Sequence, residues 1–307
     1  MTRMLRPAFV RAPSAVAALA YAAAAFAAAS PAVAASIDQR SAADPAGRIE
    51  VANTAGSVTV TGWPRNEVEV TGELGEGSER LEFTTQGKLT RIRVVLPKRS
   101  YGVDETRLVV KVPSGSGLSV NTISADIAVE GVRGGQRLQS VSGNVRTATA
   151  AQDVEIKSVS GDVEVTGSGA RSLVTLTTVS GDATLANVAG EVNANTVSGN
   201  LAITMTDVAR SRVRSTSGDL GLRGRLAADA RLDLESISGD IRLDIAGPVG
   251  AEFEVSTFNG DIRNCFGPKP VRTDEYAPGS ELRFQEGSGS AQVRIKTLNG
   301  DISVCNK

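Results

Sequence analysis

Short runs of alternating apolar and polar residues recur along most of the chain, and a glycine followed by an acidic or amide residue ends many of them. Alternation with a period of two is typical of β-strands, and Gly-Asp or Gly-Asn pairs are typical of turns. From residue 140 onward the turn takes the form of a pentad: Ser or Thr, any residue, Ser or Asn, Gly, then Asp or Asn. Copies begin at Ser140, Ser158, Thr178, Thr196, Ser215, Ser236, Thr257 and Thr297.

The pentad glycines define a repeat. They are Gly143, Gly161, Gly181, Gly199, Gly218, Gly239, Gly260 and Gly300. Up to Gly260 the intervals are 18 to 21 residues, and the last interval is 40 residues. The long interval is either two repeats, one of them degenerate, or one repeat with an insertion at about residues 266–289. The sequence leaves both possibilities open.

The residues around each pentad indicate what the repeat buries. Apolar side chains stand five positions before most of the glycines and two positions after them, as Leu138 and Val145 do around Gly143. Two short strands cannot bury a core alone, but stacked coils can. The sequence therefore predicts an all-β fold, a β-solenoid or β-helix-like stack of ~18–21-residue coils over residues 121–307. A β-sandwich of hairpins is the alternative, but it would not keep the same residues at one phase of the repeat.

Residues 36–120 lack the pentad and are expected to form an N-terminal β-rich cap that covers the first coil. Alternating or apolar runs predict its strands. They lie at residues 48–51, 58–61, 68–72, 81–85, 91–96, 107–112 and 118–121.

Residues 1–35 have the pattern of a signal peptide that is removed from the mature protein. Arg3, Arg6 and Arg11 precede an alanine-rich apolar run, and small residues follow it up to Ala35. A membrane anchor is the alternative, although the run is short for a bilayer about 30 Å thick. We expect an exported protein, periplasmic or extracellular, with no transmembrane segment in the mature chain.

Composition narrows the function classes. The 307 residues include no histidine, which excludes Ser-His-Asp catalysis and imidazole metal sites. The net charge is −1, and the leader carries three arginines and no acid, so the mature chain is mildly acidic. Nucleic acid is an improbable partner because its binding needs a basic surface.

The whole mature chain resembles one family. The segments 56–62 (GSVTVTG) and 110–113 (VKVP), and the serial Ser-Gly-Asp turns up to Asp301, are similar to the DUF4097 family of exported bacterial proteins described as candidate adhesins. The resemblance implies a β-rich, coil-stacked envelope protein. It supplies no catalytic residues that could be carried over.

The last pentad position forms a column of Asp and Asn if the coils stack. Asp219, Asp240 and Asp261 would then lie on successive coils, where carboxylates repel one another unless something compensates. Weak Ca²⁺ binding is one solution. The favoured alternative is that each side chain accepts backbone N–H groups at its own turn, with no metal and no cofactor.

The two cysteines, Cys265 and Cys305, each follow a pentad glycine by five positions. If the 40-residue interval is a single coil with an insertion, they become neighbours and a disulfide is expected in an oxidising compartment. If it is two coils, the cysteines are too far apart, and two free thiols are the alternative.

We expect a non-catalytic, adhesin-like protein that binds an unknown envelope component, glycan or protein through its β face. The alternative is a carbohydrate-active lyase or hydrolase that uses carboxylates. The candidate acids are two adjacent pairs in expected loops, Asp104-Glu105 and Asp274-Glu275. Trp63 could stack on a sugar, but a role in covering the edge of the core is favoured.

Overall fold

The fold was analysed in a computed structural model that describes residues 35–97, 104–272 and 278–306. Within these ranges the chain forms strands and no helix, which confirms the all-β prediction. The strands belong to one compact unit, residues 34–307. The expected signal peptide lies outside the described residues. The described part of the chain holds no helix that is long and apolar enough to cross a membrane.

The N-terminal strands are β1 Ala35–Ala42, β2 Arg48–Trp63, β3 Glu67–Leu74, β4 Arg80–Gln86, β5 Leu89–Val95, β6 Thr106–Pro113 and β7 Gly117–Glu130. The repeat contains β8 Gln136–Ser140, β9 Val145–Thr149, β10 Val154–Ser160, β11 Val163–Gly167, β12 Arg171–Ser180, β13 Ala183–Ser198, β14 Leu201–Ser217, β15 Leu220–Ser238 and β16 Ile241–Ile245. The C-terminal strands are β17 Ala251–Asn259, β18 Ile262–Asn264, β19 Val271–Arg272, β20 Ser280–Glu286, β21 Ala291–Asn299 and β22 Ile302–Asn306.

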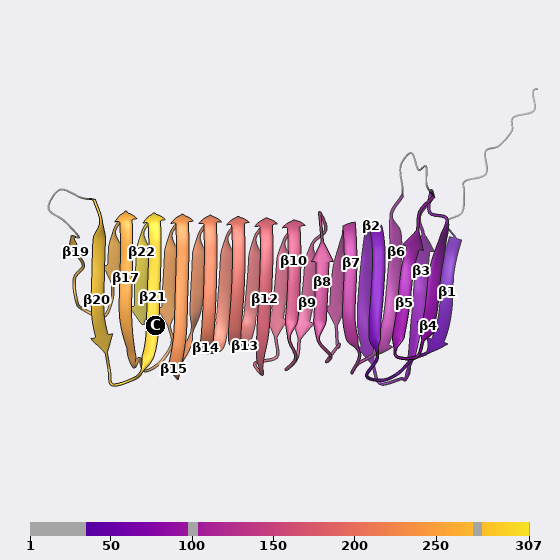
Figure 1. The fold of residues 1–307 in the computed structure, drawn as a ribbon, viewed down its shortest axis with the longest axis horizontal. Helices are drawn as coiled ribbons and strands as arrows, with labels where there is room; N and C mark the ends of the chain where they lie inside the picture. Colours follow the sequence, from indigo (N-terminus) through magenta and orange to yellow (C-terminus); the bar gives the residue numbers. More distant parts are fainter. Residues whose placement is uncertain (1–34, 98–103, 273–277, 307) are drawn as a thin grey trace, which may run out of the picture. The chain divides into compact units, whose positions relative to one another are not determined.

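Each pentad joins two strand segments that run on opposite sides of a coil. We call the segments before the pentads the first sheet and the segments after them the second sheet. In the first sheet, equivalent residues of neighbouring coils pair in parallel, so that Leu138, Ile156 and Leu176 lie side by side. The second sheet pairs in the same way through Val145, Val163 and Ala183. Coil is therefore stacked on coil through residues 118–306 (Figure 1).

The apolar positions predicted from the repeat form the core. Leu138, Ile156 and Leu176 of the first sheet are fully buried, as are Val145 and Val163 of the second. The Ser and Thr residues that begin the pentads also point inward and are buried. Ser215 Oγ donates to the carbonyl oxygen of Gly218 in its own turn at 3.4 Å. Thr257 and Thr297 donate instead to turn carbonyls of a neighbouring coil, those of Gly300 and Gly239.

The pentad glycines are required by close backbone approach. A Cβ on Gly199 would lie less than 3 Å from the carbonyl oxygen of Gly181, and the same holds at each successive turn. Gly199 also has a φ of 130°, which disfavours any other residue. The glycine column therefore keeps the turns of neighbouring coils in van der Waals contact.

The first coil begins earlier than the pentad indicates. β2 pairs in parallel with β7 on both sides of the turn at Gly56, so it forms a coil of its own. Residues 48–51 and 58–61, predicted as separate strands, both belong to β2. The boundary expected near residue 120 falls inside β7. Beyond β2 the pairing is antiparallel: β1 pairs with β3, β3 with β6, and β4 with β5. These strands cover this end of the stack.

The C-terminal coils do not follow the order of the sequence. β21 pairs in parallel with β15 on one side and β17 on the other, and β22 lies between β16 and β18 in the same way. The last coil of the chain is therefore inserted between the two coils that precede it (Figure 1). The coils of Gly260 and Gly300 are direct neighbours, but neither reading of the 40-residue interval included this insertion.

Side-chain charge and size explain the inserted order. By register, Arg294 of β21 stands between Asp233 of β15 and Glu254 of β17. In the order of the sequence, these two acids would face each other directly, which is unfavourable. Phe253 of β17 stacks on Phe284 of β20 with ring centroids 4.5 Å apart. Because β20 pairs antiparallel with β17, this aromatic contact closes the end of the stack.

Candidate binding surface

One row of apolar side chains is exposed along the stack. It consists of the second residue of each pentad and its equivalent in the preceding coil. We call it the apolar row, in stack order Ile123, Val141, Val159, Val179, Val197, Thr216, Ile237, Leu298 and Phe258. Its eight apolar members are 43–53% exposed. Single exposed apolar residues are ordinary, but a continuous row marks an interaction surface.

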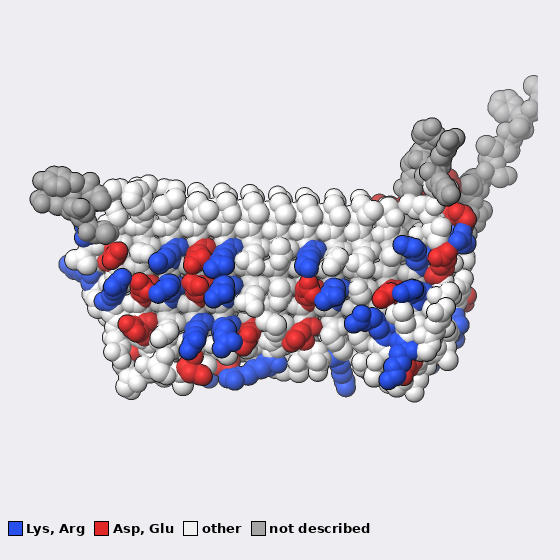
Figure 2. Space-filling model, viewed as in Figure 1, with Lys and Arg blue, Asp and Glu red and all other residues white. Residues whose placement is uncertain are grey.

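The apolar row runs along the edge of the first sheet at which its strands end. Elsewhere on that face, Figure 2 shows charged side chains in groups with uncharged stretches between them. Next to the apolar row lies a row that includes Lys157, Arg214, Glu235 and Lys296. The apolar row and the Ser or Asn residues that follow it carry no charge. The upper band over the middle of the view is white (Figure 2). The surface therefore combines an uncharged edge with a charged sheet.

Charges on the sheet pair between neighbouring coils. Arg137 donates to Glu155 at 2.8 Å, and Arg214 donates to Glu235 at 2.8 Å. Pairs of exposed charges contribute little stability each. These pairs matter for function because the arginines engage carboxylates that a hydrolase would need free.

Two acids on this sheet, Glu155 and Glu254, have lowered pKa values. A hydrogen bond from Lys157 and one from Arg137 hold the pKa of Glu155 below its ordinary value. A hydrogen bond from Arg294 holds the pKa of Glu254 below its ordinary value in the same way. A general acid at neutral pH needs the opposite shift. These two carboxyls are therefore suited to ion pairing.

The Asp and Asn residues that end the pentads form a hydrogen-bonded column. Asp182 Oδ1 accepts the backbone N–H of Asn200 at 2.8 Å, and Asn200 Oδ1 accepts that of Asp219 at 3.0 Å. The column continues through Asp240 and Asp301 to Asp261. The donor lies in the neighbouring coil, so the prediction of a bond within the same turn is wrong.

The calcium candidates Asp219, Asp240 and Asp261 belong to this column. Asp301 lies between Asp240 and Asp261, so the three are not on successive coils. In the part of the chain that the structure describes, no group of three or more Cys, Asp or Glu residues is placed to hold a metal ion. Backbone N–H groups already engage one oxygen of Asp219 and one of Asp240, and they compensate part of the charge of these carboxylates.

Cys265 and Cys305 form a disulfide with a Cα–Cα distance of 4.8 Å. It joins the end of β18 to β22 and so holds the inserted coil to its outer neighbour. Part of the segment expected as an insertion forms the end strands β19 and β20. Asp274 and Glu275 lie outside the described residues. Glu105 lies 3.6 Å from Arg107, a neighbour on the same segment.

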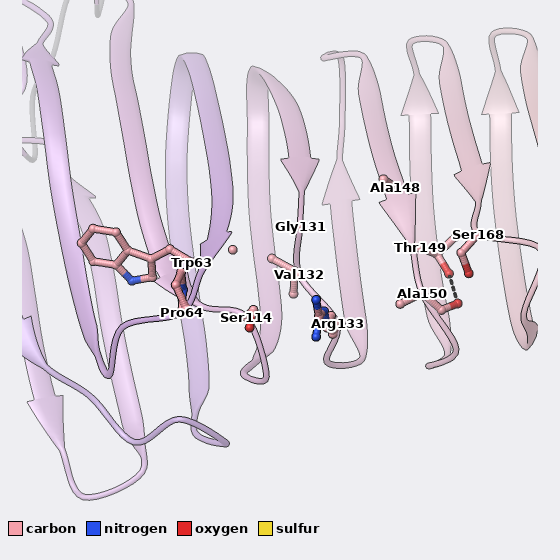
Figure 3. Close-up of a pocket in the computed structure, with 11 residues that line it drawn as sticks. Trp63, Pro64, Ser114, Gly131, Val132, Arg133, Ala148, Thr149, Ala150 and Ser168 are labelled. Atoms are coloured by element: carbon pink, nitrogen blue, oxygen red, sulfur yellow. Dashed lines mark hydrogen bonds between the residues drawn. The ribbon is translucent and has the colours of Figure 1, made fainter.

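Trp63 lines a shallow hollow with Val132, Arg133 and Thr149, of about 530 Å³. The indole ring points away from Arg133 and Thr149 (Figure 3). Its Nε1 donates to the carbonyl oxygen of Glu67 at 2.8 Å, and Arg65 lies 4.9 Å from the ring centroid. This environment fits the covering role predicted for Trp63 better than stacking on a sugar.

Sequence reasoning missed the apolar row. The second pentad position was read as open to any residue, although eight of its nine occupants are apolar. That bias was the available signal. Alternation alone could not show that these residues are exposed. Val159 stands two positions after the outward Lys157, where alternation predicts a polar residue.

A family model described as Toastrack DUF4097 matches the chain in two overlapping segments, residues 47–251 and 208–305. The first segment alone covers more than half of the chain. No curated protein matches the sequence.

Several solved structures are similar along most of the chain. A candidate adhesin from Bacteroides fragilis has 12% identity and a TM-score of 0.38, over 89% of this chain and 97% of its own. One from Parabacteroides distasonis has 8% identity and a TM-score of 0.38, over 88% and 98%. A candidate cell adhesion protein from Clostridium sporogenes has 8% identity and a TM-score of 0.25, over 89% and 100%. Superpositions this loose transfer no function to the chain.

Proposed function

Because the chain belongs to the Toastrack DUF4097 family, we propose that it is a non-catalytic, adhesin-like β-solenoid of the cell envelope or cell surface. It binds a partner, a glycan or protein of the envelope or of the exterior, through its first sheet. The observation that supports this proposal most is the apolar row. Half-exposed apolar side chains on so many consecutive coils add nothing to the core, and they favour association with another surface.

Export is part of the proposal. The pattern of residues 1–35 predicts a signal peptide, and β1 begins at Ala35, so cleavage after Ala34 leaves every described strand intact. The Cys265–Cys305 disulfide fits an oxidising compartment. Immunoblotting of cell fractions tests this point: the mature protein is expected outside the cytoplasm, and a cytoplasmic full-length chain would contradict it.

A non-catalytic role is supported by how the acids are used. Most pentad aspartates accept backbone N–H groups, as Asp219 does, and Glu155 and Glu235 of the first sheet pair with Arg side chains. A glycosidase needs two carboxyls held about 5–9.5 Å apart and free to act on one bond. Turnover of any polysaccharide by the purified protein would favour the alternative, a carbohydrate-active enzyme.

A retention assay tests the binding proposal. The mature protein is incubated with peptidoglycan, lipopolysaccharide and immobilised glycans, and the bound fraction is measured. A variant with Val159→Asp and Val179→Asp places two charges in the apolar row, and retention on the relevant material is expected to fall at least tenfold.

Thr166→Asp is the matched control. Thr166 is exposed on the second sheet of the same coils, between Ala148 and Ala186, so the substitution adds charge without touching the apolar row. Its retention is expected to equal that of the unmodified protein. If the protein is not retained on any of these materials, or if both variants bind equally well, the proposal fails.

A further inference from the structure

We infer that the partner of the apolar row is a second copy of this chain, bound in parallel about a two-fold axis that runs along the stack. The inference rests on the proposed function, because it assigns an occupant to the same surface. It is argued from the spacing, the charge and the size of the row.

Spacing is the first argument. Neighbouring coils pair through backbone hydrogen bonds, so the members of the apolar row follow one another at about 4.8 Å. Few partner surfaces carry apolar groups at that spacing over so many steps. A second copy of the chain does, because its own apolar row has the same spacing. A two-fold axis along the stack places each coil against the same coil of the partner, so Val159 faces Val159 and Phe258 faces Phe258. The long C-terminal side chains then meet each other at one end of the contact.

Charge selects the direction of the partner. The pentad carboxylates lie on one side of the apolar row, and Lys157, Arg214 and Lys296 lie on the other. With parallel copies, each carboxylate column faces the lysines and arginines of the partner. The pairs at equal height are Asp162 with Lys157, Asp219 with Arg214, and Asp301 with Lys296.

Where the column carries an amide, the opposing row carries one too. Asn144 stands at the height of Gln139, and Asn200 at that of Asn195. Asp182 and Asp261 face the uncharged Thr177 and Ser256, and one like-charged pair remains, Asp240 with Glu235. An antiparallel partner would instead place the two carboxylate columns side by side, which is unfavourable along their whole length.

Size sets the strength. The apolar row could bury on the order of 500 Å² of accessible surface per copy, because its side chains are about half exposed. A stable interface buries about 800 Å² per partner. We therefore expect a weak, reversible dimer, formed at the high local concentration of a cell surface.

Sedimentation velocity over about 10 μM to 1 mM of the mature protein tests the association. The weight-average mass is expected to rise toward that of a dimer across this range. The Val159→Asp, Val179→Asp variant is expected to stay monomeric, with a dissociation constant raised at least tenfold, and Thr166→Asp is expected to associate like the unmodified protein. A monomer at every concentration, or equal association of both variants, would overturn the inference.

Cysteine cross-linking tests the direction. Ser160 and Ser238 follow the third and seventh members of the apolar row, at equal distances from its middle, and are exposed. In a parallel dimer, Ser160→Cys and Ser238→Cys each form a disulfide-linked dimer with itself. Cross-linking only in a mixture of the two variants would show an antiparallel pair and overturn the parallel arrangement.

The two proposals can fail separately. If the protein is monomeric but its retention on envelope material still depends on Val159 and Val179, the second copy is excluded and the binding surface stands. If it dimerises through the apolar row and is retained on no envelope material, the surface serves self-association alone.

Discussion

At the scale of single residues, the last pentad position joins one coil to the next. Asp219 Oδ1 accepts the N–H of Asp240 at 2.9 Å, and Asp240 Oδ1 accepts the N–H of Asp301 at 2.8 Å. Asn200 takes the same place with its amide oxygen. The position therefore needs a short side chain with an acceptor oxygen, and it tolerates the loss of the charge.

Replacing Asp240 by Ala removes an acceptor from the column. We expect a loss of about 1 kcal/mol in the free energy of unfolding, typical of one hydrogen bond. Asp240→Asn keeps the acceptor and is expected to stay within about 0.5 kcal/mol of the unmodified protein. Urea denaturation of the two variants checks this, and equal stability of Ala and Asn would contradict it.

Gly199→Ala is expected to be far more costly. The new Cβ would lie less than 3 Å from the carbonyl oxygen of Gly181, at a φ of 130°. Such strain costs about 1–3 kcal/mol before any clash is counted. Gly221→Ala is the control, since its Cβ would lie 3.8 Å from the nearest heavy atom and its φ is not in the left-handed region. Thermal melting should show a large fall in Tm for the first variant alone.

At the scale of the strands, charge pairs specify which coils are neighbours. Glu254 of β17 binds Arg294 of the inserted β21 at 2.8 Å and Arg283 of β20 at 3.2 Å. One carboxylate thus links β17 to two strands that come later in the sequence, β20 and β21. Its charge favours the inserted order over the sequential one.

Acid is therefore expected to weaken this end of the stack. The pKa of Glu254 is lowered in the folded protein, so its contribution is complete above the unfolded pKa of about 4.3 and is lost as pH falls through the lower folded value. The Tm of the unmodified protein should fall below about pH 4 more steeply than that of Glu254→Gln. Parallel pH dependences of the two proteins would show that Glu254 does not contribute.

The strands of the repeat could be predicted because one local pattern specifies them: inward Leu138, outward Gln139 and the turn at Gly143 recur together. The inserted position of β21 could not be predicted in that way. It depends on Arg294 standing opposite Asp233 and pairing with Glu254, an arrangement of distant segments that leaves no local period. The apolar row was equally hidden, because its exposure is a property of the folded sheet.

At the scale of the whole described unit, the disulfide between Cys265 and Cys305 holds the inserted coil. The cysteines are separated by 40 residues, and closing a loop of that length stabilises by about 4 kcal/mol in the chain-entropy model. A reducing agent is therefore expected to lower the Tm. The Cys265→Ser, Cys305→Ser variant should melt at the reduced value and be insensitive to the reductant, and an unchanged Tm on reduction would contradict the prediction.

The inserted coil also constrains when folding can finish. A chain that crosses a membrane amino end first presents β15 and β16 long before β21 and β22, because residues 246–290 must emerge in between. Until then the edges of β15 and β17 that will receive β21 stay unpaired, and such edges attract other strands. Completion of the fold must therefore wait until residues 291–306 are free to pair. Under the export proposed above, the chain would be most exposed to misassembly in the interval before these last strands reach the compartment where it folds.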